Sequence, residues 1–258
     1  YNFDDDEYSE THTKDSVDYA PVVENNEVVE NRPPVSTDFF HTHHRVWVCD
    51  GVTYGADLKV RNSDLISVNN YRNGNVLNSF DIEREYADMA TFDSKNLKYI
   101  YQELDSINSK QGFSDFEFAE LIVTMVQDVR YAYVLGEDCE TYFGTIDNDA
   151  AKDDCKGNVR MGVQSPVQFM ADLKGDCDTR TVFLYSILKN YGYDVAILNS
   201  DIYLHSMLGL NLKSRITGDY IEHYGKRYYF WETTGKNFPI GMLPSETSNT
   251  NYWYVALN

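Results

Sequence analysis

The chain has 258 residues, of which 42% are hydrophobic and 14% aromatic, enough for one sizeable core with at most a small additional unit. Its formal net charge of −19 at pH 7 argues against nucleic-acid phosphate and against an anionic membrane surface as partners. No apolar run approaches the roughly 18 residues that a transmembrane helix needs, so we expect no membrane-spanning segment in this chain.

Residues 1–36 are expected to form an acidic, largely disordered tether. Ten acidic residues stand there against Lys14 and Arg32, few apolar side chains interrupt them, and the segment ends in Arg32-Pro33-Pro34. In the alternative interpretation, Val22-Val23 or Val28-Val29 adds a strand to a neighbouring sheet.

Residues 37–80 are predicted to form a small β-rich unit packed on the core. Val46-Trp47-Val48 is strand-like, Asp50-Gly51 is a turn, and apolar residues alternate with polar ones from Val52 to Val60 before the run Leu65–Val68. His41, His43 and His44 precede this pattern. They indicate either a transition-metal site or a solvated strand entry, and the lack of a carboxylate or cysteine at matching spacing favours the strand.

Two helices are predicted next. Apolar residues recur on one helical face from Ser94 to Asn108. Ser114 followed by Glu117 is a capping box that begins the second helix, which continues to the segment Val126–Tyr131. Gln127 and Tyr131 lie one helical turn apart and are expected to face the same side.

The polar loop 136–159 predicts a disulfide between Cys139 and Cys155, which flank its central part. The alternative is two free thiols. A zinc site is not expected, because no second pair of Cys or His lies at zinc-ligand spacing nearby. Asp147-Asn148-Asp149 and Asp153-Asp154 raise the possibility of calcium, but the oxygen-ligand spacing of an EF-hand is missing. We therefore expect no metal and no cofactor.

Cys177 lies at the start of a predicted helix. Ser165–Leu173 is read as a short helix with Pro166 in its first turn, and Gly175 allows a sharp turn before Asp176 and Cys177. Phe183, Ile187 and Tyr191 then mark one apolar face of the next helix. The helix dipole favours the thiolate of Cys177, whereas the adjacent carboxylates oppose it, so a reactive and a structural cysteine both remain open.

The segment after this helix predicts a sheet. Asp194–Leu198 and Leu204–Leu212 are strand candidates, and two strands around Tyr224-Gly225 form a hairpin that ends near Glu232. A helix followed by these strands indicates an α+β fold with an antiparallel sheet packed on the Cys177 helix.

Cysteine nucleophile chemistry requires a base and a third group that orients it. His205 opens one predicted strand and Glu232 closes another, so adjacent strands would align both with Cys177. His223 is a rival base, but it lies within the hairpin. A histidine at a strand start and a glutamate after an aromatic run are also common without any catalytic role.

The order of these segments resembles the transglutaminase-like superfamily, the permuted relatives of papain-type cysteine proteases, and most of all its microbial members. The segments that carry the resemblance are Val126–Tyr131, Lys174–Asp178, Tyr191–Val195, His205–Gly209, Tyr228–Thr234, Ile240-Gly241 and Pro244. With the unit from Trp47 to Asn75, they cover most of the chain after the tether.

The resemblance implies a transglutaminase-like domain over residues 81–258, with Cys177, His205 and Glu232 as the catalytic triad. Glu232 stands where most of the superfamily has Asp. The segment Asp178–Arg180 differs from the acidic pair of many relatives, so calcium binding is not implied.

The expected chemistry is thiol-dependent acyl transfer on peptide or isopeptide bonds. The backbone N–H of Cys177 and one further donor would donate hydrogen bonds to the oxyanion. In papain-type relatives the further donor is a Gln, so Gln127 and Gln168 are the candidates here. Water as the acceptor gives a peptidase or amidase and an amine gives a transglutaminase; the resemblance favours hydrolysis. A catalytically inactive module that binds peptide or glycan at the cell envelope is the alternative, and a purely structural domain is a third.

The expected location is extracytoplasmic, whether secreted, periplasmic or surface-anchored. The predicted disulfide requires an oxidising compartment. Because the sequence begins at Tyr1 rather than Met, a signal or anchor is expected to have been removed. The expected partner is a peptide or protein substrate.

Overall fold

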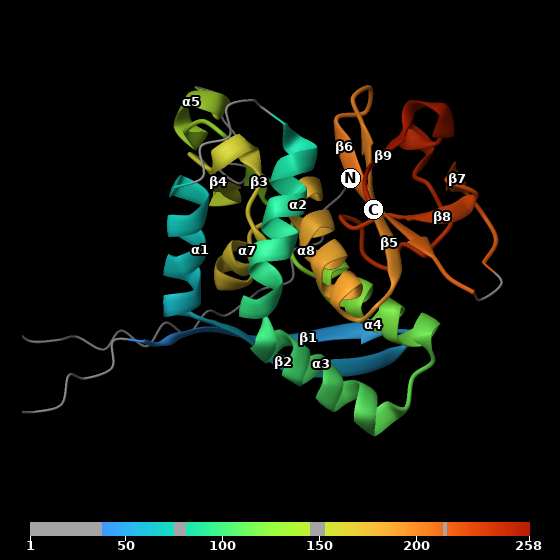
Figure 1. Ribbon diagram of the computed structural model, residues 1–258, viewed down its shortest axis with the longest axis horizontal. Coiled ribbons are helices and arrows are strands. Elements are labelled where there is room, and N and C mark those ends of the chain that lie inside the picture. The colour runs from blue at the N-terminus through green and yellow to red at the C-terminus, as the bar shows by residue number, and fades with distance from the viewer. Residues whose placement is uncertain (1–37, 75–80, 145–152, 214–215) are drawn as a thin grey trace, which may run out of the picture. The chain divides into compact units, whose positions relative to one another are not determined.

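The computed structural model describes residues 38–74, 81–144, 153–213 and 216–258 (Figure 1). The predicted tether over residues 1–36 lies outside the described residues. Residues 37–258 form one compact unit, so the predicted β-rich segment belongs to the same unit as the rest. Within the described residues, no helix is long and apolar enough to cross a membrane.

A two-stranded antiparallel hairpin begins the described chain. β1 (Phe40–Cys49) and β2 (Val52–Arg61) pair along their whole length around the Asp50-Gly51 turn. Trp47 on β1 and Leu58 and Val60 on β2 are buried, as the alternation predicts. In Figure 1 the hairpin lies below α1, α2, α7 and α8, and α3 runs along its lower side.

The strand predicted at Leu65–Val68 is wrong, because these residues lie in helix α1 (Asn62–Gly74). A short apolar run does not distinguish a strand from a buried helix segment. Here the buried positions are Val68 and Arg72, four residues apart, and this helical face packs on α7. The Asp38 side chain accepts a hydrogen bond from the Ser63 backbone N–H at the start of the helix (3.1 Å).

Three α-helices follow within residues 81–127, one more than the sequence predicted. α2 (Ile82–Asp93) was not foreseen, and it packs on α8. The predicted helix from Ser94 is a 3-10 turn, η1 (Ser94–Asn96), followed by α3 (Lys98–Gln111). α4 (Asp115–Gln127) begins at the predicted capping box of Ser114 and Glu117.

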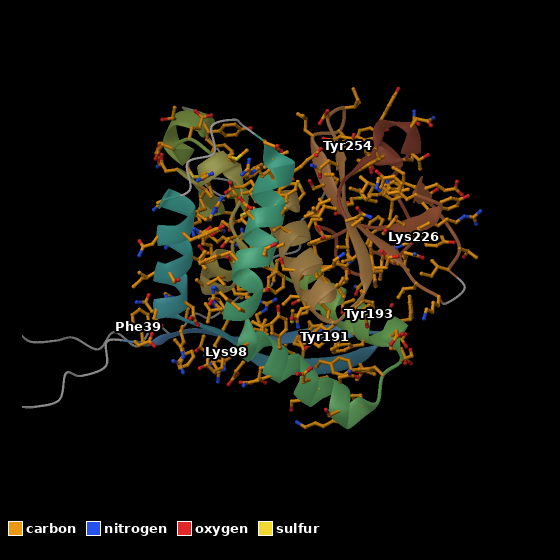
Figure 2. All side chains as sticks on the ribbon, in the orientation of Figure 1. Phe39, Lys98, Tyr191, Tyr193, Lys226 and Tyr254 are labelled. Atoms are coloured by element: carbon orange, nitrogen blue, oxygen red, sulfur yellow. A yellow bond between two sulfur atoms is a disulfide. The ribbon has the colours of Figure 1, made fainter. Side chains whose placement is uncertain are left out.

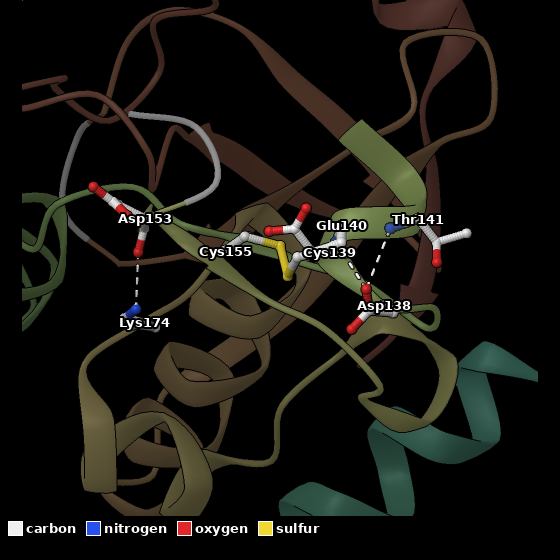
Figure 3. The surroundings of a disulfide bond; sticks show 7 residues. All are labelled: Asp138, Cys139, Glu140, Thr141, Asp153, Cys155 and Lys174. Carbon is white, nitrogen blue, oxygen red and sulfur yellow. Dashed lines mark hydrogen bonds between the residues drawn. A yellow bond between two sulfur atoms is a disulfide. The ribbon is translucent and has the colours of Figure 1, made fainter. Parts of the chain in front are cut away.

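The predicted disulfide is confirmed: Cys139 and Cys155 are joined, with an S–S distance of 2.08 Å (Figure 3). It connects the start of α5 (Cys139–Phe143) to β4 (Cys155–Lys156), which pairs with β3 (Tyr133–Val134). Lys174 donates to the Asp153 backbone carbonyl (3.0 Å), which links this segment to the chain just before Cys177. A 3-10 turn, η2 (Arg160–Gly162), comes next.

Two helices lead into and through the region of Cys177. α7 (Pro166–Asp172) has Pro at its first turn and a capping box at Ser165, and α8 (Cys177–Asn190) begins at Cys177. The far end of α8 is held by Tyr191 and Tyr193, which are labelled in Figure 2. Tyr191 donates to Asp105 Oδ1 (2.9 Å) and Tyr193 to the Asp115 backbone carbonyl (2.7 Å).

The main sheet is antiparallel throughout, with the strand order β7-β8-β6-β5-β9. A mixed helix and sheet architecture with an antiparallel main sheet agrees with the predicted α+β class. Two 3-10 turns precede the last strand. The remaining bounds are β5 (Asp194–Ser200), β6 (His205–Asn211), β7 (Tyr220–His223), β8 (Lys226–Trp231), η3 (Ser245–Thr247), η4 (Thr250–Tyr252) and β9 (Tyr254–Leu257).

The sheet is covered on both faces by apolar side chains. α8 packs against β5 and β6, and its buried face joins α4 and the hairpin in the main core. On the opposite face a smaller cluster forms around Trp253, Phe230 and Leu198. The start of β6 therefore lies where the main core, the small cluster and the N-terminus of α8 meet, and this is where the site residues gather.

Candidate active site

Cys177 is the first residue of α8 and is only 7% exposed. Asp176 caps the helix, since its side chain accepts a hydrogen bond from the Thr179 backbone N–H (3.1 Å). Gly175 before it has no room for a side chain, because an added Cβ would lie 2.8 Å from the Phe169 ring. The thiol is therefore carried by a tightly packed turn at a helix N-terminus.

His205 and Glu232 are hydrogen-bonded to each other. His205 is the first residue of β6, and Glu232 directly follows β8, the neighbouring strand. Their side chains meet with His205 Nε2 and Glu232 Oε2 2.9 Å apart. The His205 ring also contacts the edge of Trp253, with centroids 6.0 Å apart.

Glu232 is fixed by donors on its other oxygen. Oε1 accepts hydrogen bonds from the Thr233 and Thr234 backbone N–H groups (2.8 and 2.7 Å) and from the Thr234 hydroxyl (2.6 Å). Burial alone would raise the pKa of Glu232, but the hydrogen bond and charge of His205, together with the Thr234 donors, lower it below the ordinary value. Glu232 is therefore an ionised acceptor that orients the imidazole.

The thiol of Cys177 lies against the start of β6. The Ser206 backbone N–H acts on it as a hydrogen-bond donor, and the charge of Glu232 also reaches it. Burial, followed by the charges of Asp178 and Asp176, raises the pKa of Cys177 well above the ordinary value. Burial is the largest of these causes and the adjacent carboxylates add to it, so the resting cysteine is a neutral thiol.

The adjacent carboxylates belong to a buried polar network. Asp178 accepts hydrogen bonds from the Tyr86 hydroxyl on α2 (2.6 Å) and from the Ser206 hydroxyl. Ser206 lies next to Asn199, with Oγ and Oδ1 2.7 Å apart. Burial, and then the charge of Asp178, raises the pKa of Asp176 to about 7.

The two glutamines proposed as oxyanion donors are both engaged elsewhere, and Gln127 has no free amide N–H. Gln127 Nε2 donates to the backbone carbonyls of Glu232 and Phe238 (2.7 and 2.9 Å). It supports the segment that carries Glu232, and its own Oε1 is buried without a partner among the described residues. This hydrogen bonding does not favour Gln127 as the donor.

Gln168 is directed away from Cys177. Its amide binds Arg72 (2.6 Å) and Asn69 (2.6 Å), and it lines a cavity of about 450 Å³ that none of Cys177, His205 and Glu232 lines. The cavity lies between α1, α7 and the segment 156–160, and its charged lining residues are Arg72, Lys156, Arg160 and Asp172.

Tyr131 was expected to face the same side as Gln127 on one helix, but α4 ends at Gln127 and Tyr131 lies outside it. Its backbone bridges to Gly175, and the charge of Cys177 acts on its phenol. Burial is the largest cause that raises the pKa of Tyr131, so the hydroxyl remains a neutral donor beside the thiol. The only sequence signal was its place one turn after Gln127.

The other candidate ligands and bases lie elsewhere. His43 bonds the Ala171 backbone carbonyl (3.1 Å), while His44 on the opposite face of β1 pairs with Asp57 (2.5 Å). His223 contacts Tyr224 and Tyr228 on the β7–β8 hairpin. The described residues include no group of three or more His, Cys, Asp and Glu side chains placed to hold a metal. Asp147-Asn148-Asp149 lies outside the described residues.

Comparisons with protein-family models, with curated proteins and with solved structures give no match to this chain.

Proposed function

We propose that this protein is a thiol-dependent acyl-transfer enzyme, most simply a cysteine peptidase or amidase with a papain- or transglutaminase-like arrangement of Cys177, His205 and Glu232. The observation that carries the proposal is the hydrogen bond between His205 and Glu232 beside a thiol that lies against Ser206, the residue after the histidine. A base held by a buried carboxylate next to a cysteine is the arrangement that thiol nucleophiles require.

The proposed first step begins with the pairing of His205 and Glu232. Glu232 occupies His205 Nε2, which leaves Nδ1 to accept the Cys177 proton as the sulfur attacks a carbonyl carbon. Because the resting thiol is neutral, the proton moves when the substrate arrives rather than before. The oxyanion would be met by the Cys177 backbone N–H at the start of α8, with the Tyr131 hydroxyl as the second donor.

The second step returns the enzyme to its starting state. The imidazolium of His205 gives its proton to the leaving amine as the C–N bond breaks, which leaves a thioester on Cys177. Water then attacks the thioester, and its proton returns through His205 to the sulfur. An amine in place of water would give transamidation on the same residues.

The proposed substrate is a peptide or protein, and the proposed location is extracytoplasmic. The Cys139–Cys155 disulfide supports the location, since such bonds persist in oxidising compartments.

A non-catalytic module that binds peptide or glycan is the second candidate. Two observations favour it: Cys177 is 7% exposed, and the pKa of its thiol is raised well above the ordinary value. In this alternative the buried thiol would be a packing residue and His205 a surface contact.

Alkylation of the native protein by iodoacetamide across pH, read by mass at Cys177, decides between the two. We expect Cys177 to react at neutral pH and to lose that reaction in a His205→Ala variant, because the base that removes the proton is gone. Cys49 is a built-in control, since it is also free and buried and burial is the main cause that raises its pKa. Equal labelling of Cys177 in both proteins, or none in either, would support the binding module.

A further inference from the structure

Arg180 is a fully buried arginine one helical turn after Cys177 on α8. Its guanidinium donates only to backbone carbonyls among the contacts of the described residues. Nε donates to Gly175 (2.9 Å), Nη2 to Val129 (2.7 Å), and Nη1 to Val126 and Thr233 (3.4 and 3.3 Å).

These carbonyls come from three separate parts of the chain. Val126 and Val129 lie at the end of α4, Gly175 lies in the turn before Cys177, and Thr233 directly follows Glu232. One side chain therefore fixes the backbone on either side of the proposed triad. A neutral group with the same donors would satisfy the same carbonyls, so the hydrogen bonds alone do not explain why a cation is buried here.

The charges around Arg180 supply the explanation. Burial lowers the pKa of Arg180 to about 10, but the ionised forms of Tyr131, Asp176, Glu232 and Cys177 act in the opposite direction, so the guanidinium remains charged at neutral pH. Asp176 and Glu232 are the carboxylates among them: Asp176 directly follows Gly175 and Glu232 directly precedes Thr233, the two residues whose carbonyls Arg180 binds. Burying a cation without a hydrogen-bonded carboxylate is costly unless nearby negative charge offsets it.

The thiol of Cys177 is otherwise surrounded by negative or neutral groups. Asp178 and Asp176 from its own segment and Glu232 from β8 oppose a thiolate. The phenols of Tyr131 and of Tyr86, which binds Asp178, are neutral at ordinary pH. In the proposed mechanism His205 takes the thiol proton and is then a cation. In this set of groups, Arg180 is the permanent positive charge.

We propose that Arg180 is a positioning residue whose fixed positive charge balances the buried anions of the site, so that the Glu232 carboxylate and a transient Cys177 thiolate can exist together. The inference deepens the proposed function and depends on it. It assigns to Arg180 an electrostatic role in addition to its structural one.

The test compares two substitutions that separate charge from geometry. Arg180→Gln removes the charge and keeps an amide donor, whereas Arg180→Lys keeps a charge and loses the forked donor geometry. We expect the pH midpoint of Cys177 alkylation to rise by about one to two units in the Gln variant and by less than half as much in the Lys variant.

Arg72→Gln is the matched control. Arg72 is also buried (6% exposed) and also donates to backbone carbonyls, but it pairs with the carboxylate of Glu85. We expect this variant to lower the melting temperature and to leave the alkylation midpoint of Cys177 unchanged. Equal midpoints in wild type and Arg180→Gln, or equal shifts in Gln and Lys, would overturn the proposal.

A double variant covers the case in which Arg180→Gln does not fold. Asp176→Asn with Arg180→Gln removes one charge of each sign, so we expect it to melt above Arg180→Gln and to bring the midpoint back towards wild type. A double variant no more stable than the single one would overturn the charge role.

The two proposals fail separately. Alkylation that does not depend on His205 rejects the proposed enzyme. Alkylation that depends on His205 but has the same pH midpoint in Arg180→Gln as in wild type rejects only the role of Arg180.

Discussion

The Cys177 site and the cavity lined by Gln168 are both polar, yet their charges are arranged differently. In and behind the cavity each cation has a hydrogen-bonded carboxylate: Arg72 and Arg160 share Glu85, and Lys156 binds Asp172. At the Cys177 site Asp176, Asp178 and Glu232 gather around a thiol. Within the described residues, the hydrogen bonds of the buried cation, Arg180, go only to backbone carbonyls, and its guanidinium lies over the Tyr131 ring.

The difference shows that open volume is a poor guide to chemistry here. The cavity offers about 450 Å³, but its charges are already balanced. The Cys177 site is nearly closed, and its pKa values are displaced by burial and by neighbouring charges, which is typical of sites that perform chemistry. The following predictions test this contrast, beginning with the largest expected effect.

Glu232→Gln is expected to lower the rate of Cys177 alkylation at pH 7 by about 10²- to 10⁴-fold, because the neutral amide no longer holds His205 in the required tautomer. The rate is followed by intact mass with iodoacetamide in excess. Gln168→Glu, a change of comparable size in the cavity, should leave the rate within about twofold of wild type. A Glu232→Gln protein that reacts like wild type would show that this carboxylate does not orient the base.

Glu85→Leu is expected to lower the free energy of unfolding by about 3–5 kcal/mol, since it leaves Arg72 buried without its carboxylate. Urea denaturation followed by far-UV circular dichroism measures this loss. The pH midpoint of Cys177 alkylation should not move. A shift in that midpoint would mean that the two regions are electrostatically coupled, contrary to the contrast drawn above.

Removal of the disulfide by Cys139→Ser with Cys155→Ser is expected to cost about 3 kcal/mol in the free energy of unfolding, as a cross-link of this loop length constrains the unfolded chain. The bonded residues are 16 apart in sequence. The same denaturation experiment applies, with Cys177 alkylation as the control for an intact site. Unchanged stability would indicate that the loop contributes nothing to the unfolding equilibrium.

Asp176→Asn is expected to raise the free energy of unfolding by up to about 4 kcal/mol at pH 8 and to change it little at pH 4. The folded protein binds the Asp176 proton more tightly than the unfolded chain does, because its pKa is raised to about 7 from the ordinary 3.8. The wild-type contribution of this group therefore falls as pH rises from about 4 to 7. Asn still caps Thr179, and a gain that is equal at both pH values would contradict the assignment.

Local sequence signals predicted the elements that carry the site. Gly175 and Asp176 before an apolar helical face place Cys177 at the start of α8, and short apolar and aromatic runs bounded by turns mark β6 and β8. These signals succeed because caps, turns and strand alternation depend on neighbours in the sequence.

The predictions that failed concern features set by contacts between residues far apart in the sequence. Leu65–Val68 forms a helix because α7 covers that face. Gln127 has no free N–H because the carbonyls of Glu232 and Phe238, more than a hundred residues away, take both hydrogens. Arg180 looked like an ordinary helix residue, since the carbonyls that surround it belong to segments whose positions no local pattern reveals.

The contact of Trp253 with His205 has a consequence for the order in which the site is completed during synthesis. Trp253 is 4% exposed and packs on Phe230 as well as on the His205 ring. It is translated after all three proposed triad residues, directly before β9, which pairs with β5. A nascent chain can therefore bring His205 and Glu232 together before Trp253 leaves the ribosome, but one side of the imidazole stays open to water until it does.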